Sequence, residues 1–361
     1  MASKTFLLSS FFFATILLTL CFKLSTAQMV PAMFIFGDSL VDVGNNNHLP
    51  VSIAKANFPH NGIDFPTKKA TGRFSNGKNA ADFLAEKVGL PSSPPYLSLS
   101  SKNASAFMTG VSFASGGAGI FNGTDQTLRQ SMPLTQQVGD YESVYGVLVQ
   151  KLGSSPAQKL LSKSLFAIVI GSNDIFGYSN SSDRNKSTPQ EYVDLMILTL
   201  KQLVQRIYAY GGRKFFISGV APIGCTPSRR VRIQSEACNE EINSMAVTYN
   251  ERLKSMLQKL NSELKGVSYS YFDAYAMLEN IIQKPATYGF TEVKAACCGL
   301  GTLKAKVPCL PIAKYCSNRK DHVFWDLFHP TEAAARILVD TVFDGPSQYT
   351  YPMNVRQLIT V

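Results

Sequence analysis

The feature that most constrains the fold is a series of short apolar runs, each ending in glycine or small polar residues. Five such runs are predicted to be strands, at residues 34–36, 111–114, 165–170, 214–220 and 267–272. A run that is apolar throughout, such as 165–170, is typical of a parallel strand buried on both faces. The runs alternate with helical patterns, which predicts one doubly wound α/β domain around a central parallel sheet of about five strands.

Capping signals and apolar residues at helical spacing predict the helices. The clearest start is Thr188-Pro189-Gln190-Glu191, a capping box with proline at the first helical position. The other helices are expected at 80–88 after Asn79, at 133–152, at 236–264, and from Pro330 to about residue 343. Two segments without sustained periodicity, 45–79 and 276–324, are expected to be irregular and to lie near the edge of the sheet where its functional residues gather.

Residues 1–27 have the pattern of a cleaved signal peptide. Lys4 precedes the apolar run 6–22, and Ser25-Thr26-Ala27 offers the small residues that signal peptidase reads. A membrane anchor is the competing interpretation, but polar residues interrupt the run. We therefore expect a secreted, extracellular protein in which residues 28–361 form a single domain, with no integral membrane segment.

Cysteine usage agrees with secretion. Six cysteines follow the signal, at 225, 238, 297, 298, 309 and 316. An even number is compatible with three disulfides, but the pairing cannot be read from the sequence. A zinc site is disfavoured because there is no CxxC pair or nearby histidine cluster. Sequons at Asn103, Asn122, Asn180 and Asn185 are candidate glycosylation sites.

The chain is basic. Its formal charge of +10 becomes +8 without Lys4 and Lys23 of the signal. Such a protein is attracted to acidic surfaces, and we expect loose association with acidic cell-wall polysaccharide or anionic lipid. Nucleic acid is not an expected partner, because aromatic residues are not interleaved with the basic ones in any recognisable module.

Ser39 is a candidate nucleophile. The apolar run 34–36 stops at Gly37-Asp38-Ser39, so a hydroxyl follows the carboxyl end of a strand, where open α/β sheets bind ligands. The alternative is that Ser39 only caps a following helix.

A serine nucleophile needs a base, and the chain has four histidines. His48 and His60 lie in a polar segment, and His322 follows a charged run. His329 stands three residues after Asp326, so that carboxylate can orient the imidazole as the third member of a serine triad does. The alternative is an Asp326 that helps to cap the last helix, beside a buried, hydrogen-bonded His329.

Other strand ends supply hydrogen-bond donors. Gly116 and Gly117 follow the run at 111–114, and Asn173 follows the run at 165–170. At one sheet edge, the N–H groups of Ser39 and Gly116 and the Asn173 amide could donate to an oxyanion. Acyl transfer fits these groups, although the Gly-x-Ser-x-Gly elbow of the α/β-hydrolases is absent.

Four ordered blocks carry a family resemblance: residues 36–47 around Gly37-Asp38-Ser39-Leu40, residues 113–119, residues 171–174 and residues 325–331. Together they resemble the GDSL esterase/lipases, the plant-type secreted branch of the SGNH hydrolases. The resemblance implies a flavodoxin-like three-layer α/β/α fold without metal or cofactor.

The same resemblance implies site residues: Ser39 as nucleophile, His329 as base, Asp326 as its orienting acid, and Gly116 and Asn173 as oxyanion donors beside the Ser39 N–H. Ser112 stands where relatives often have asparagine, and the choice between Gly116 and Gly117 stays open.

The leading hypothesis is a secreted carboxylic-ester hydrolase that forms an acyl-enzyme on Ser39. Its substrate would be a small-molecule, lipid or polysaccharide-linked ester. An acyltransferase with the same triad and a non-catalytic matrix-binding protein on the same fold are the alternatives. The acyl chain length cannot be read, because the irregular segments shape the pocket.

Overall fold

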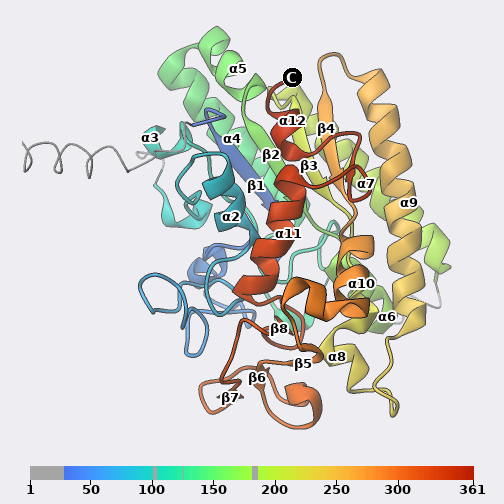
Figure 1. Cartoon of the computed structure of the whole chain (residues 1–361). Coiled ribbons are helices and arrows are strands. Elements are labelled where there is room, and N and C mark those ends of the chain that lie inside the picture. The colour runs from blue at the N-terminus through green and yellow to red at the C-terminus, as the bar shows by residue number, and fades with distance from the viewer. Residues whose placement is uncertain (1–27, 101–103, 125, 181–185) are drawn as a thin grey trace, which may run out of the picture.

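The computed structural model is built around a five-stranded sheet (Figure 1). Its strands, in spatial order, are β1 (Met33–Gly37), β2 (Leu165–Val169), β3 (Lys214–Ser218), β4 (Ser268–Phe272) and β9 (Thr350–Tyr351). β1 to β4 are parallel, and β9 pairs antiparallel with β4 at one edge. The expected mostly parallel sheet is confirmed. β9 was not predicted, because two residues carry no periodic signal.

The run at 111–114 is not a strand of this sheet. It lies along the edge of β1 that is not paired with β2. Phe113 N–H donates to the Ile35 carbonyl at 2.7 Å, and Ile35 N–H donates to the Val111 carbonyl at 3.0 Å. The pairing amounts to an isolated parallel bridge between Ile35 and Ser112, so the predicted strand is wrong as an element. Its position outside β1 still produces the strand order of flavodoxin-like folds.

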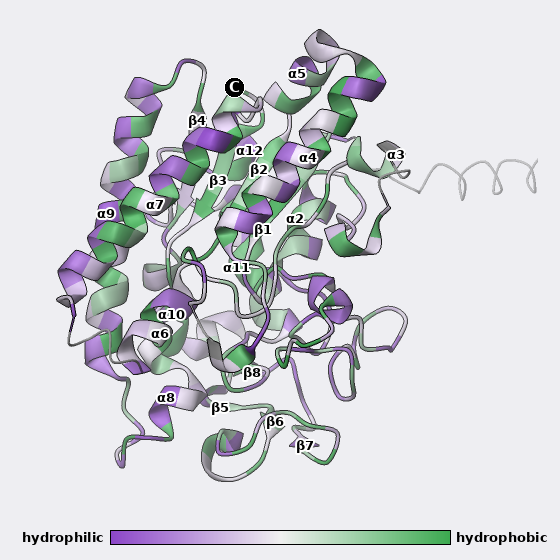
Figure 2. Cartoon of the chain, turned by 180° about the vertical axis from the view of Figure 1, so that it is seen from behind, coloured by the Kyte–Doolittle hydropathy of each residue, from purple (hydrophilic) through white to green (hydrophobic). Residues whose placement is uncertain are grey.

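Helices cover both faces of the sheet, because alternate strand residues point to opposite sides. Phe34 and Phe36 of β1 belong to one buried cluster, and Met33 and Ile35 belong to the other. The first cluster is completed by α4 (Leu134–Leu152), α5 (Ser154–Ser162), α6 (Ser172–Asn180), α7 (Pro189–Ala209) and α9 (Glu240–Glu263). The second is completed by α2 (Ala80–Lys87), α10 (Ala274–Gln283), α11 (Glu332–Asp344) and α12 (Val355–Leu358). Figure 2 shows the sheet largely green, between helices that alternate purple and green.

The capping predictions for α7 and α2 are confirmed. Thr188 accepts the Glu191 N–H and Glu191 accepts the Thr188 N–H, and Asn79 forms the same reciprocal box at α2. Two other starts were predicted too early. α9 begins at Glu240 after the cap Asn239, and α11 begins at Glu332 after the cap Thr331.

Tertiary contacts explain both late starts. Cys238, just before α9, is tied to Cys225 by a disulfide. Pro330, expected to begin the last helix, instead forms a bridge with Phe324. Since an extended residue cannot begin a helix, Thr331 takes over as the cap of α11 and accepts the Ala334 N–H.

The two aperiodic segments are mostly irregular, as expected. Within 45–79 the described helix is the short η1 (Asn45–His48). The segment 276–324 carries the end of α10 and two small sheets, in which β5 (Glu292–Ala296) pairs with β8 (His322–Phe324) and β6 (Cys298–Gly299) pairs with β7 (Lys314–Tyr315). The remaining elements are α3 (Ala104–Phe107), α8 (Pro227–Arg230), η2 (Tyr96–Ser98), η3 (Gln126–Leu128), η5 (Ile223–Cys225), η6 (Pro285–Tyr288) and η7 (Thr302–Lys304).

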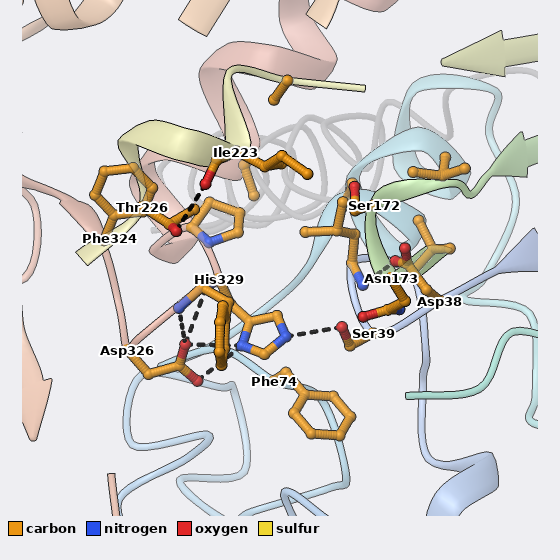
Figure 3. A pocket seen from close by; sticks show the side chains of 18 of the residues that line it. Asp38, Ser39, Phe74, Ser172, Asn173, Ile223, Thr226, Phe324, Asp326 and His329 are labelled. Carbon is orange, nitrogen blue, oxygen red and sulfur yellow. Dashed lines mark hydrogen bonds and ion pairs between the residues drawn. The ribbon is translucent and has the colours of Figure 1, made fainter. Parts of the chain in front are cut away.

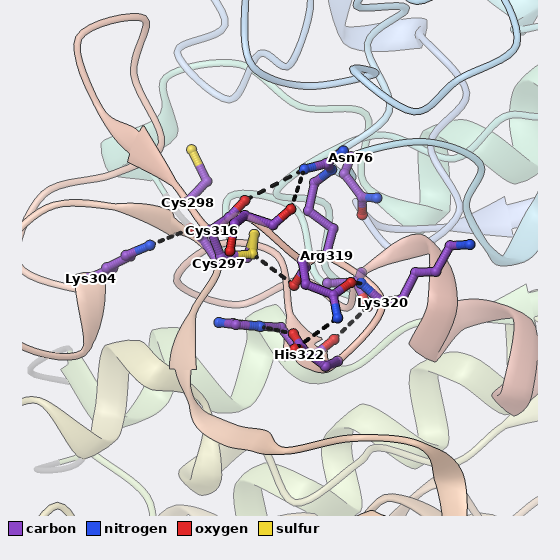
Figure 4. Close-up of a disulfide and its surroundings, with 12 residues drawn as sticks. Asn76, Cys297, Cys298, Lys304, Cys316, Arg319, Lys320 and His322 are labelled. Atoms are coloured by element: carbon purple, nitrogen blue, oxygen red, sulfur yellow. Dashed lines mark hydrogen bonds and ion pairs between the residues drawn. A yellow bond between two sulfur atoms is a disulfide. The ribbon is translucent and has the colours of Figure 1, made fainter.

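Three disulfides join Cys225 to Cys238, Cys297 to Cys316 and Cys298 to Cys309, which confirms three bridges and supplies their pairing. Figure 4 shows that the Cys297–Cys316 bridge lies beside Arg319, which binds Asp64 of the other irregular segment. The two irregular segments are thereby tied to each other.

The structure describes residues 28–100, 104–124, 126–180 and 186–361. The predicted signal peptide and the sequons at Asn103 and Asn185 lie outside these residues. Over the described ranges, none of the helices combines the length and the apolar character that crossing a bilayer requires.

Candidate active site

Ser39 lies at the carboxyl end of β1 because Gly37 allows the chain to turn there. Gly37 has φ +153°, and a Cβ at this position would lie 2.2 Å from the Val169 carbonyl oxygen of β2. Gln137 of α4 accepts the Gly37 N–H and donates to the Gly37 carbonyl, each at 2.8 Å. No helix begins directly after Ser39, so the structure does not support a capping role for this serine. Gln137 was not anticipated, because nothing in its local pattern distinguishes it from other polar helix residues.

Ser39, His329 and Asp326 form one continuous chain of hydrogen bonds (Figure 3). His329 Nε2 lies 2.8 Å from Ser39 Oγ, and His329 Nδ1 lies 2.8 Å from both carboxylate oxygens of Asp326. Asp326 Oδ1 also accepts the backbone N–H groups of Phe328 and His329 at 2.9 Å. The carboxylate therefore holds both the ring and the backbone of the histidine, while Thr331 caps α11, the helix that follows.

The other three histidines do not reach Ser39. His322 Nδ1 pairs with Asp321 at 2.6 Å, the His60 ring packs on Tyr315, and His48 ends η1 at the surface. The structure therefore brings together the serine, histidine and aspartate that the sequence singled out.

The irregular segment 45–79 forms one wall beside His329. The Phe74 ring lies 5.0 Å from the His329 ring, centroid to centroid. The neighbouring Arg73 is buried and binds Asp82 of α2 through both Nε and Nη2, each at 2.7 Å. This two-point ion pair fixes the loop on the helix and holds Phe74 against the imidazole.

Burial changes the acidity of the carboxyl groups near the site. Burial alone would raise the pKa of Asp326. The charge of protonated His329 and the hydrogen bonds that the carboxylate accepts outweigh this effect and hold the pKa below its usual 3.8. Burial raises the pKa of Asp38 to about 7 and the pKa of both Asp42 and Asp174 to about 6. Asp326 is therefore ionised at neutral pH, as an orienting carboxylate must be.

The predicted oxyanion donors are only partly brought together. Gly116 N–H donates to Asp42 Oδ2 at 3.0 Å, so it is already engaged. Gly117 lines the cavity with φ +81°, and in the described part of the chain no acceptor takes its N–H or that of Ser39. Asn173 Nδ2 donates to the Ala118 carbonyl at 2.9 Å, which fixes the amide and leaves its second N–H for the cavity.

A cavity of about 740 Å³ opens beside these groups. Its wall is mainly apolar, and we divide its lining residues into two groups, which we call the inner and the outer part. The inner part lies between the sheet and helices α2, α10 and α11, where its lining includes Ile35, Ala167, Phe216, Leu278, Ala334 and Ala335. The outer part is lined by side chains that include Phe58, Leu128, Phe176, Arg229 and Leu310. Small alanine side chains leave the space of the inner part open.

The two sequons within the described residues lie at the surface. Asn122 is exposed, and its side chain accepts a hydrogen bond from Thr135. Asn180 is exposed at the edge of the cavity, and its Oδ1 accepts from Arg229 at 3.1 Å. Glycosylation at all four sequons remains a prediction.

The fold and the hydrogen-bonded serine, histidine and aspartate have the geometry that a serine-dependent hydrolase requires. The GDSL-like Lipase/Acylhydrolase family matches residues 33–342. The chain is 54% identical to GDSL esterase/lipase At5g55050 of Arabidopsis thaliana, over 92% of this chain and 90% of the relative. It is 40% identical to GDSL esterase/lipase At5g37690 of the same plant, over 89% of this chain and 90% of the relative. The chain belongs to the GDSL-like lipase/acylhydrolase family and is a carboxylic-ester hydrolase.

Proposed function

We propose that the protein hydrolyses acyl esters in two steps through a covalent acyl-enzyme on Ser39. As Ser39 Oγ attacks the ester carbonyl, His329 Nε2 takes the hydroxyl proton, and it then returns this proton to the departing alcohol. Water, activated by the same nitrogen, attacks the acyl-enzyme and releases the acid and Ser39. The observation that carries this proposal is the continuous hydrogen-bond chain from Ser39 Oγ to Asp326.

For the tetrahedral intermediate we assign three donors: the N–H groups of Ser39 and Gly117 and the second Nδ2–H of Asn173. Gly117 replaces Gly116 because the Gly116 N–H already binds Asp42. Each donor of this kind typically contributes about 3 kcal/mol to transition-state stabilisation.

The inner part of the cavity is proposed to take the acyl chain. Its residues line the same cavity as Ser39, and a lining that is mainly apolar favours the alkyl chain of an ester over a polar group. Esters of medium or long acyl chains are therefore the expected substrates. Secretion is part of the same proposal, supported by the three disulfides and the pattern of residues 1–27.

The Ser39→Ala variant tests the mechanism. We expect its kcat for a 4-nitrophenyl ester to fall by about 10⁴-fold or more, with an unchanged melting temperature, because the nucleophile is lost while the fold is not. A fluorophosphonate probe should label Ser39 in wild-type protein and leave the variant unlabelled. Turnover retained in the variant would contradict the proposal, and absence of labelling in folded wild-type protein would favour a binding protein on the same fold.

A further inference from the structure

The α8 helix carries an arginine that the proposed reaction does not use. Arg229 is only 6% exposed, and its guanidinium lies over the Phe176 ring with Cζ 4.3 Å from the centroid. Nη1 donates to Asn180 Oδ1 at 3.1 Å. Nε is buried without a hydrogen-bond partner, and no carboxylate of the described residues forms an ion pair with this side chain.

This arrangement is unfavourable without a further partner. Buried arginine is almost always paired, because desolvating its charge and leaving an N–H unbonded both cost free energy. Burial, followed by the positive charge of Arg232, lowers the pKa of Arg229 to about 10. The side chain therefore still carries its positive charge at neutral pH.

Another buried arginine of the same chain shows what is missing. Arg73 places its Nε and Nη2 edge against both oxygens of Asp82. In Arg229, Nε is unpartnered, and Nη2 makes no hydrogen bond with any part of the chain that the structure describes. Neither nitrogen of this edge thus has a hydrogen-bond partner in the protein; Nε is covered by neighbouring atoms, but Nη2 is not fully buried and is the donor that an anionic group in the cavity can reach.

Arg229 lines the same cavity as Ser39, in its outer part. A series of ring contacts leads from His329 to it: the Phe328 ring lies 6.1 Å from the His329 ring and 5.6 Å from the Phe176 ring, on which Arg229 stacks. The exposed Arg232 also lines this part and adds a second positive charge.

We propose that Arg229 binds an anionic group, a carboxylate or a phosphate, on the ester substrate, with Arg232 increasing the attraction. The inference rests on the proposed ester hydrolysis and specifies its substrate: an ester that combines an apolar acyl chain with a negative charge remote from the scissile bond.

Matched substrate pairs test this. In the first series the acyl chain of a 4-nitrophenyl ester ends in a carboxylate or in the isosteric carboxamide, at several chain lengths. In the second series the leaving phenol carries the carboxylate, a phosphate or the carboxamide. At constant ionic strength, wild-type protein should prefer the anionic member in one series, and Arg229→Gln should reduce that preference about tenfold or more, mainly through KM. Arg229→Lys should retain part of the preference, because it keeps the charge without the guanidinium donor at Nη2.

Arg336→Gln is the matched control. Arg336 stacks on Phe83 with Cζ 4.2 Å from the ring centroid, as Arg229 stacks on Phe176, but it does not line the cavity. It should keep the wild-type preference. The same preference in wild type and Arg229→Gln would overturn the inference. An equal loss of kcat/KM for both members of a pair would also overturn it, because it would indicate a structural role for Arg229.

Binding measurements separate this inference from the proposed reaction. Dissociation constants of the paired esters, measured on Ser39→Ala protein with and without Arg229→Gln, do not require turnover. A tighter constant for the anionic ester that disappears with Arg229→Gln would support the inference even if wild-type protein failed to hydrolyse either ester. Equal constants for both esters on Ser39→Ala would overturn it while leaving the hydrolysis proposal intact.

Discussion

Asp38 separates Gly37 from the proposed nucleophile and is almost fully buried. Its carboxyl group accepts a hydrogen bond from the Leu40 N–H, which donates to Oδ1 at 3.0 Å. Burial raises its pKa to about 7, and the hydrogen bond from the Leu40 N–H and the charge of protonated His329 only partly offset this effect. A carboxyl group that is neutral when folded but charged when unfolded links the stability of this turn to pH.

The direction of this pH dependence follows from the proton that Asp38 releases on unfolding. In the unfolded chain Asp38 ionises near pH 3.8, whereas in the folded protein it keeps its proton up to about pH 7. Unfolding between these values releases a proton, so the free energy of unfolding falls as pH rises from about 4 to about 7 and is constant with respect to this group above that. The shift corresponds to about 4 kcal/mol at most.

Asp38→Asn is therefore expected to remove part of the fall in the free energy of unfolding between about pH 4 and pH 7. Asparagine retains the oxygen that accepts the Leu40 N–H but has no proton to release. As pH rises from about 4 to about 7, the variant should gain stability relative to wild type. The gain should also be seen between pH 6 and 7, an interval that lies above the pKa of about 6 of Asp42 and Asp174 and below that of Asp38. Urea unfolding at several pH values measures this difference.

Asp344→Asn is the control, because burial is not the main influence there and Arg356 lowers its pKa. It should follow the wild-type slope from pH 5 to 7. Parallel curves for wild type and Asp38→Asn would disprove the expected link.

At the scale of elements, α11 both supports the site and bounds the cavity. Its cap, Thr331, comes two residues after His329. One turn further on, Ala334 and Ala335 are buried and line the inner part of the cavity. If the inner part holds the acyl chain, as proposed, the helix that begins three residues after the proposed base also limits the length of chain that the site accepts.

Ala335→Leu should shorten the acyl chain that the enzyme prefers. The larger side chain fills space in the inner part, so kcat/KM for esters of about twelve carbons should fall about tenfold or more, while two- to four-carbon esters lose little. A series of 4-nitrophenyl esters measures this profile. Equal losses at every chain length, or a profile identical to wild type, would show that the inner part does not hold the acyl chain.

At the scale of the whole molecule, net charge governs weak association. Residues 28–361 carry a formal charge of +8. We expect this chain to bind polygalacturonate at 0.01 M salt and to be released well below 1 M, because the screening length shrinks from about 30 Å to about 3 Å over that range. Cosedimentation measures the binding, and uncharged dextran is the control. Retention independent of salt, or equal on dextran, would exclude a charge-driven association.

Local sequence determined the four parallel strands and the longest helices of this protein. Short apolar runs located β1 to β4, and the capping residues Asn79 and Thr188 located the starts of α2 and α7, because these signals act within a few residues. The blocks around Ser39, Asp326 and His329 also indicated the family and the residues of the candidate site.

Only the tertiary structure decided what depends on segments distant in the chain. Ser39 and His329 are 290 residues apart yet lie 2.8 Å apart. Other features likewise depend on which side chains meet after folding. These are the pairing of the six cysteines, the hydrogen bonds of Gln137 to Gly37 and of Gly116 to Asp42, and the missing hydrogen-bond partners of Arg229. A local pattern specifies a residue's own conformation, but the partners of a buried polar group are set by packing, and packing is a property of the whole fold.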